Sequence, residues 1–305
     1  MYAFYKKVDS EYQITQDIYN DNGILLLGKG QKVTKEIIDI FERNWKHKIE
    51  MPNVASYKQR EIPAHYDSHG DVLIPGKSHS QIFTPNDSYS ALTSVTRKFA
   101  EKMNICDNSI LEKPNKMLIN IIFESRNKPW WIYVNALSNY IDWLYTHSID
   151  VALISMMIAA ELGYSDEELT NLGIGTLLHD VGKLLIPKHI LQSPERLTIE
   201  EMFLVRKHCE LGVSSLEGFD LPKEYLNIAM QHHERLDGSG YPKGLKKDEI
   251  CRNAKIAMVA DTVDAITSFR PYRQPEPLDV AIKELRNGEE KYPQELISLL
   301  EKILK

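Results

Sequence analysis

Cysteine is scarce in this sequence. Three cysteines occur in 305 residues, Cys106, Cys209 and Cys251, and no two of them form a CxxC pair. A disulfide framework and a cysteine-based zinc site are therefore not expected, and this usage fits a reducing compartment such as the cytoplasm.

The sequence also lacks an apolar run long enough to cross a membrane. The longest run, 151–160, lies between Asp150 and Glu161 and is about half of what a bilayer core of ~30 Å requires. The first residues, MYAFYKK, do not contain the apolar core of a signal peptide. We therefore expect a soluble cytoplasmic protein with no membrane span.

An excess of basic residues is missing as well. Lys and Arg number 37 against 43 Asp and Glu, which gives a net charge of −6 at pH 7. Proteins that bind duplex nucleic acid usually carry a basic excess that neutralises phosphates. We expect no DNA partner, while a small anionic ligand is compatible with positive charge gathered at one place.

The first part of the chain predicts a small mixed module. The stretch 14–28 reads as short strands separated by glycine turns, and Thr34 reads as the N-cap of an amphipathic helix. Proline and glycine interrupt residues 51–86, which we interpret as a linker or a long ordered loop. We therefore expect an α/β or α+β regulatory or partner module at 1–125, with the linker around 51–86.

The rest of the chain predicts helices. Apolar residues recur at helical spacing through 87–128, with a break expected at Pro114, and 130–162 continues as helix. Residues 149–162 are apolar on nearly every face, which predicts burial at the centre of a bundle. The fold class is therefore mainly α, with a helical domain at 126–305.

Histidines and aspartates recur inside these apolar segments. Burying an imidazole or a carboxylate is costly unless the group has a partner. A single buried histidine is more often a hydrogen-bonded core residue than a ligand, but this chain places five of its ten histidines in such segments together with two aspartates. These groups favour a metal site with mixed imidazole and carboxylate ligands, and they are His147, His179, Asp180, His208, His232, His233 and Asp261.

The motifs that carry these groups resemble those of the HD-GYP family, a branch of the HD superfamily of metal-dependent phosphohydrolases. They are HDVGK at 179–183, HHERLDGSGYP at 232–242, DTVDA at 261–265 and RPYR at 270–273. The similarity covers roughly residues 140–273, and the second string is the most specific part. It implies an HD-type helical bundle as the catalytic domain at 126–305.

The resemblance implies a dinuclear metal site. His147, His179, Asp180 and Asp261 correspond to the ligands of one metal, and His208, His232 and His233 to those of the other, with Asp180 bridging the two. Such ligands without thiolate suit several divalent transition metals. Iron is the expected metal, with manganese or another divalent metal as the alternative.

One position departs from the family pattern. Some members carry a glutamate one helical turn before the first histidine, which helps to bind a third metal, and this sequence has Trp143 there. Asp142, next to it, faces another side of the helix. We therefore expect two metals, and we interpret Trp143 as a core residue.

The resemblance also implies roles for residues around the metals. Asp180, Lys183 and Asp264 are the expected catalytic residues, and the expected substrate contacts are Lys183, Gly240, Tyr241, Pro242, Arg270 and Arg273. Guanidinium groups suit phosphate or guanine edges, although both arginines could also be ordinary surface residues. For Asp264, three roles stay open: orienting a ligand, protonating the leaving oxygen, or a structural role on the helix surface. Tyr241 could serve turn packing alone.

The function that the resemblance implies is a phosphodiesterase. It would hydrolyse cyclic di-GMP to pGpG, GMP or both, through a hydroxide that bridges two metals. One alternative is a sensor or docking module that binds a cyclic dinucleotide without turnover. The other is a phosphohydrolase for a different substrate, such as a hybrid cyclic dinucleotide or a mononucleotide phosphate. Signalling proteins such as GGDEF-type cyclases are candidate partners, and the sequence leaves open whether the protein forms a homodimer.

Overall fold

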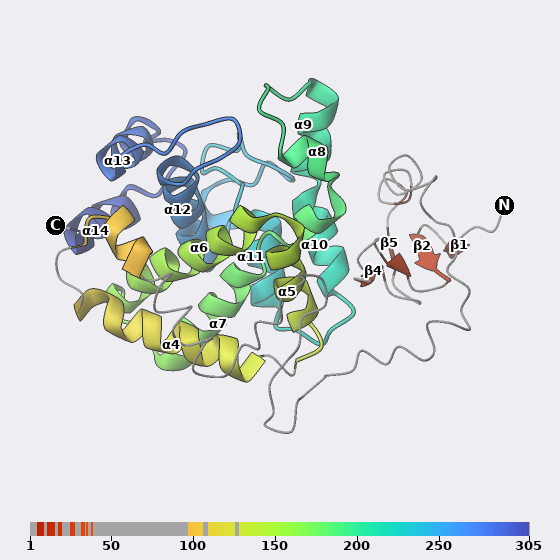
Figure 1. The fold of residues 1–305 in the computed structure, drawn as a ribbon, viewed down its shortest axis with the longest axis horizontal. Helices are drawn as coiled ribbons and strands as arrows, with labels where there is room; N and C mark the ends of the chain where they lie inside the picture. Colours follow the sequence, from red (N-terminus) through yellow and green to blue (C-terminus); the bar gives the residue numbers. More distant parts are fainter. Residues whose placement is uncertain are drawn as a thin grey trace, which may run out of the picture.

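The computed structural model describes residues 97–105, 109–125 and 128–304, together with short pieces of the chain before residue 39. Figure 1 shows the described helices gathered into one bundle, with short strands near the N-terminus.

Five short strands occur in the described N-terminal pieces. They form an antiparallel sheet in the order β1-β2-β5 and an antiparallel pair β3-β4. Their bounds are Tyr5–Val8, Glu11–Ile14, Ile18–Tyr19, Leu25–Leu27 and Lys32–Val33 for β1 to β5. The strands expected around 14–28 are therefore present. The linker expected around 51–86, and most of the helix expected after Thr34, lie outside the described residues.

The described residues beyond 96 are mainly helical, which confirms the predicted fold class. Residues 97–102 are helical and precede the labelled helices. These are α4 (Ser109–Ser125), α5 (Trp131–Tyr140), α6 (Asp142–Glu161), α7 (Asp166–Leu177), η1 (Val181–Leu185), α8 (Lys188–Leu191), α9 (Ile199–Arg206), α10 (His208–Leu216), α11 (Lys223–Gln231), η2 (Lys247–Glu249), α12 (Arg252–Thr267), α13 (Leu278–Asn287) and α14 (Gln294–Leu304).

Helix α6 is the centre of the bundle, as its apolar composition predicts. It packs against α4, α5, α7, α12 and α14, and the side chains of 151–159 are buried on all sides. The part Trp143–Glu161 is long and apolar enough to cross a bilayer, but 72% of its most apolar window is buried inside the fold. A fully apolar helix of this kind fits the core of a helical bundle.

Two details differ from the expected helices. Helix α4 continues through Pro114, so the break expected there is wrong. Proline removes one backbone donor near the start of the helix, and Pro114 is buried on the side that also buries Leu111 and Leu118, so packing holds the helix together. The expected helix at 130–162 is divided at Ile141, whose backbone is extended with φ −145° and ψ 124°.

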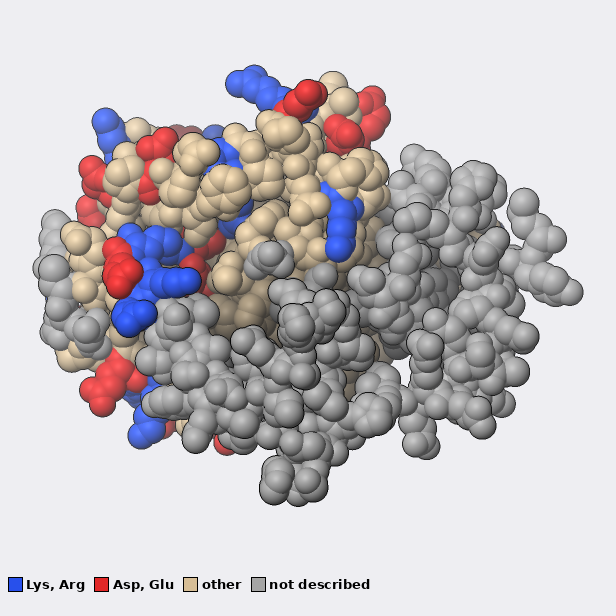
Figure 2. Space-filling model, in the orientation of Figure 1, with Lys and Arg blue, Asp and Glu red and all other residues tan. Residues whose placement is uncertain are grey.

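The described surface carries charges of both signs. On the face in Figure 2, acidic and basic side chains of the described residues are interspersed with uncharged ones. This distribution agrees with the nearly balanced numbers of acidic and basic residues in the chain.

Candidate metal centre

The seven expected ligands come from separate helices that meet in the core. His147 lies on α6, Asp261 lies on α12, and His208 is the first residue of α10. His179 and Asp180 form the turn between α7 and η1, while His232 and His233 follow the end of α11. Of these seven, six are at most 5% exposed as residues, and His233 is partly buried.

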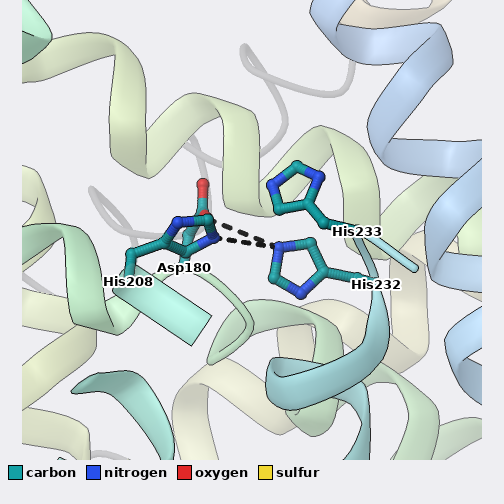
Figure 3. Close-up of side chains that lie close together, drawn as sticks. All are labelled: Asp180, His208, His232 and His233. Atoms are coloured by element: carbon teal, nitrogen blue, oxygen red, sulfur yellow. Dashed lines mark hydrogen bonds and ion pairs between the residues drawn. The ribbon is translucent and has the colours of Figure 1, made fainter. Parts of the chain in front are cut away.

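The ligand atoms form two groups, each within 4.8 Å. One group is Asp180, His208, His232 and His233, and the other is His147, His179 and Asp261. Figure 3 shows the first group, in which the three imidazoles and the carboxylate converge from different segments of the chain.

Asp180 lies between the two groups. Its Oδ1 is 3.4 Å from His208 Nε2 and 3.8 Å from His232 Nε2. Its Oδ2 is 3.3 Å from His147 Nε2 and 3.5 Å from His179 Nε2. One carboxylate oxygen therefore faces each group, which is the placement that a bridging ligand needs.

Backbone carbonyls fix the orientation of three imidazoles. A carbonyl oxygen only accepts hydrogen bonds, so the nitrogen beside it must carry the proton and the other ring nitrogen keeps its lone pair. The Nδ1 atoms donate to Thr176 O at 2.5 Å for His179, Val205 O at 2.7 Å for His208 and Ala229 O at 3.0 Å for His232. As a result, the Nε2 lone pairs of His208 and His232 face each other at 3.2 Å. Such outer contacts are typical of histidines that bind metals.

Among the described residues, three buried polar atoms at the centre lack a hydrogen-bond partner. They are His147 Nε2, His179 Nε2 and Asp180 Oδ1. Buried polar atoms are almost always satisfied in folded proteins, and facing lone pairs repel each other. Divalent cations bind such lone pairs on nitrogen and carboxylate oxygen, so the residues present fit a metal centre.

The environment favours the protonation states that metal ligands require. Burial lowers the pKa of His208 to about 4 and holds those of His179, His232 and His233 below the usual value. Burial alone would raise the pKa of Asp180, but the Lys183 ammonium and the nearby histidines hold it well below its usual range. These four imidazoles are therefore neutral and the Asp180 carboxylate is ionised, as metal binding requires.

His147 differs from the other histidines. Burial lowers its pKa and Arg270 lowers it further, but the carboxylates of Asp180, Asp261 and Asp264 around the ring outweigh both and raise it to about 10. A metal that binds His147 Nε2 must therefore displace a proton.

Asp264 contacts His147 on Nδ1, the ring nitrogen that faces away from the other expected ligands. The carboxylate is fully buried and its Oδ2 accepts from His147 Nδ1 at 2.5 Å. It is therefore not on the helix surface, and its contact agrees with the ligand-orienting alternative. Lys102 also donates to Asp264, at 2.6 Å to Oδ1.

Lys183 contacts the carboxylate of Asp180, and the loop at 240–242 lies beside His233. Lys183 Nζ is 2.5 Å from Asp180 Oδ2. Tyr241 stacks on the His233 ring at 4.7 Å, and its backbone N donates to His233 O at 3.2 Å. A Cβ at Gly240 would lie 2.4 Å from the backbone of Glu234 and Arg235, so only glycine fits there. Pro242 follows Tyr241 through a cis peptide bond.

The two expected substrate arginines differ in exposure. Arg270 is 4% exposed, donates from Nη2 to Asp264 Oδ2 at 3.1 Å, and lies 4.3 Å above the Trp143 ring. Arg273 is partly exposed, with Nη2 3.9 Å from a carboxylate oxygen of Glu284. Trp143 therefore contacts Arg270 in addition to the core.

Sequence reasoning missed two residues that approach this centre, Lys102 and Asp150. Asp150 follows His147 by about one helical turn and interrupts an apolar helix, a signal that could have identified it. Lys102 is 162 residues away from Asp264, and nothing in its local sequence indicates that contact. Glu234 fixes the loop that follows it, because its carboxylate accepts from Lys243 N and Leu245 N at 2.8 and 2.9 Å.

Several known proteins are similar in sequence to this chain. A cyclic di-GMP phosphodiesterase of Thermotoga maritima is 41% identical over 157 residues, which are 50% of this chain and 43% of that protein. The cyclic di-GMP phosphodiesterase PA4108 of Pseudomonas aeruginosa is 37% identical over 44% of this chain and 32% of its own length. The 3'3'-cGAMP-specific phosphodiesterase 3 of Vibrio cholerae is 38% identical over 45% of this chain and 30% of its own length. The chain thus spans less than half the length of these relatives.

The sequence profile of the HD domain family matches residues 132–296, which is more than half of the chain. All seven expected ligands fall inside this range. The protein therefore belongs to the HD domain family, in agreement with the HD-GYP resemblance of its motifs.

Proposed function

We propose that the protein is a metal-dependent phosphodiesterase that hydrolyses cyclic di-GMP to pGpG, GMP or both. The observation that carries the proposal is the position of Asp180, which faces both histidine groups and has the Lys183 ammonium beside it. Similarity to proteins named cyclic di-GMP phosphodiesterases supports the choice of substrate.

Each part of the site would have its own task. His147, His179 and Asp261 would hold one metal, and His208, His232 and His233 the other, with Asp180 shared between them. Two bound divalent metals supply an activated water and a clamp for the phosphodiester. Asp264 would keep the His147 ring oriented through Nδ1, and Lys183 would offset negative charge on the phosphate oxygens.

Substrate contacts would come from the loop at 240–242 and from the arginines. Tyr241 is partly buried and lies over His233, so its ring forms one edge of the site. Arg273 is the more accessible arginine, whereas Arg270 would have to give up contacts with Asp264 to bind a phosphate. We propose that Arg273 makes the first contact with the dinucleotide.

The proposed metal is iron, with manganese or another divalent metal as the alternative. Imidazole and carboxylate ligands accept all of these ions. Elemental analysis of protein purified without oxygen would identify the metal and its stoichiometry, which we expect to be two per chain.

Turnover of cyclic di-GMP by metal-loaded protein tests the function. We expect Asp180→Ala to reduce turnover to below roughly 1% of wild type, because the shared ligand of both metals is lost. Asp220→Ala, at an exposed position, is the matched control and should retain full activity. Full activity of Asp180→Ala would contradict the proposal.

Two other functions give different results in the same assay. Tight binding of cyclic di-GMP without hydrolysis under any reduced-metal condition would indicate a sensor or docking module. The similarity to a 3'3'-cGAMP-specific phosphodiesterase favours the hybrid dinucleotide as a second candidate substrate. Competition between the two dinucleotides at equal concentration distinguishes them.

We also propose that residues 1–125 include the regulatory or partner module and that 126–305 is the catalytic domain. A contact with a GGDEF-type cyclase and a homodimer belong to the same proposal, and co-purification and light scattering test them.

A further inference from the structure

Helical residues 97–102 are anchored in the core of the bundle, although they precede the range that matches the family. Phe99 and Met103 are at most 1% exposed and belong to the same hydrophobic cluster as the buried residues of α6 and α12. Figure 1 draws this segment in orange. The segment therefore has a fixed position relative to the helices that carry the metal ligands.

Lys102 extends from this segment to the place where α6 and α12 meet. Its Nζ donates to Asp150 on α6, and to Asp264 Oδ1 at 2.6 Å and Ser268 Oγ at 3.0 Å on the α12 side. The Lys102 side chain is 19% exposed. One ammonium group thus uses all three of its protons on partners that lie on or next to the two helices bearing His147 and Asp261.

Charge balance gives this contact its importance. Burial together with the nearby Asp264 carboxylate raises the pKa of Asp150 to about 7. Burial alone would raise the pKa of Asp264 too, but His147, Lys102 and Arg270 hold it below its usual value. Lys102 and Arg270 bring two positive charges to these two carboxylates. With these cations beside it, Asp264 stays ionised, and its Oδ2 accepts from His147 Nδ1 while Lys102 occupies Oδ1.

We propose that Lys102 is a positioning residue for the metal centre, through which the segment before the HD domain controls the orientation of His147. The chain of contacts runs from Lys102 Nζ to Asp264 Oδ1, and from Asp264 Oδ2 to His147 Nδ1. Displacement of residues 97–105 would remove the ammonium from Asp264 and leave Ser268 and Arg270 as its remaining donors besides His147. The His147 ring would then be held less firmly, and binding at the group formed with His179 and Asp261 would weaken. The inference rests on the proposed metal site, and it gives the region before the domain a route to regulate that site.

Metal binding, rather than hydrolysis, tests this inference. Metal-free protein is titrated with Co²⁺ under anaerobic conditions, because Co²⁺ absorption reports both affinity and ligand geometry. Lys102→Met should weaken the binding of one of the two Co²⁺ ions about 10-fold and change its spectrum, because Asp264, the outer partner of His147, loses its ammonium. Lys102→Arg should recover most of the affinity, and Lys98→Met, at an exposed position of the same segment, should match wild type.

A double variant separates positioning from folding. Lys102→Met with Asp150→Asn leaves the net charge of the buried group unchanged, so it should fold, yet Asp264 still lacks its ammonium partner. We expect its Co²⁺ binding to stay weak. Wild-type affinity and spectrum in either folded variant, including a variant with a lowered Tm, would overturn the inference. If wild-type protein binds two Co²⁺ ions but hydrolyses no dinucleotide, the proposed function fails while this inference stands.

Discussion

At the scale of single residues, the site depends on buried imidazoles and carboxylates, each held by a few hydrogen bonds or ion pairs to particular residues. The sequence predicted that these residues gather at one site because imidazoles and carboxylates in apolar segments are costly, and the structure brings them together in two groups. It could not predict that Arg270 would be buried against Trp143 and Asp264, because that depends on how α6 and α12 pack. An arginine in RPYR looks the same in sequence whether it faces substrate or core.

Glu234 offers a test at this scale. Its two carboxylate oxygens accept separately from Lys243 N and Leu245 N, and the residue is fully buried. Glu234→Gln keeps the shape but turns an amide donor toward one backbone donor. We expect a loss of about 2 kcal/mol in the free energy of unfolding, measured in urea, because one buried N–H loses its acceptor.

The exposed Glu217→Gln is the control for that change and should alter stability by less than about 0.5 kcal/mol. Equal stability of both variants would show that Glu234 does not hold the loop. The Glu234→Gln substitution should also disturb Tyr241, whose backbone N donates to His233 O within the same loop.

At the scale of elements, η1 and α10 must touch for His208 to reach Asp180. A Cβ at Gly182 would lie 1.9 Å from His208 O and 2.5 Å from Gly212 N, which is backbone and cannot move aside. We expect Gly182→Ala to destabilise the protein by about 3 kcal/mol or more and to weaken metal binding, because α10 must shift. Thermal unfolding and metal titration measure the two effects.

Gly218→Ala is the matched control, since a Cβ there meets nothing within 4 Å. Its Tm should be equal to wild type or slightly higher, because alanine restricts the unfolded chain. A normal Tm and normal metal affinity for Gly182→Ala would show that η1 and α10 are less closely packed than the structure has them.

Helices were predicted best where apolar residues follow a clear pattern in the sequence. Helix α6 followed from its composition, whereas Pro114 suggested a break that burial of its own side chain prevents. In the sequence, Gly182 is only one letter of the HDVGK string and shows no reason for glycine. The close approach of two backbones, which is the actual reason, involves α10 and appears only in three dimensions.

At the scale of the whole molecule, several histidines are buried together in the core, so the free energy of unfolding depends on pH. Burial lowers the pKa of His208 from 6.5 to about 4, and those of His179, His232 and His233 are also lowered. Between pH 6.5 and about 4, the unfolded chain binds protons that the folded chain does not, so stability falls as pH falls. His208 alone corresponds to roughly 3 kcal/mol.

His147 does not offset this loss. Its raised pKa of about 10 means that its contribution is fully present below pH 6.5 and disappears as pH rises toward 10. Asp150, whose pKa is raised to about 7, gains stability as pH falls and offsets part of the loss. Four histidines with lowered pKa values outweigh this one carboxyl group, so we expect the Tm of chelator-treated protein to fall between pH 7 and pH 5. Metal-loaded protein should fall less over the same range, because bound metals hold the imidazoles neutral. His189→Gln, at an exposed position on α8, should leave both profiles unchanged. A metal-free Tm that stays constant from pH 7 to pH 5 would mean that the histidines are not buried together as neutral groups, and the metal centre would lose its physical basis.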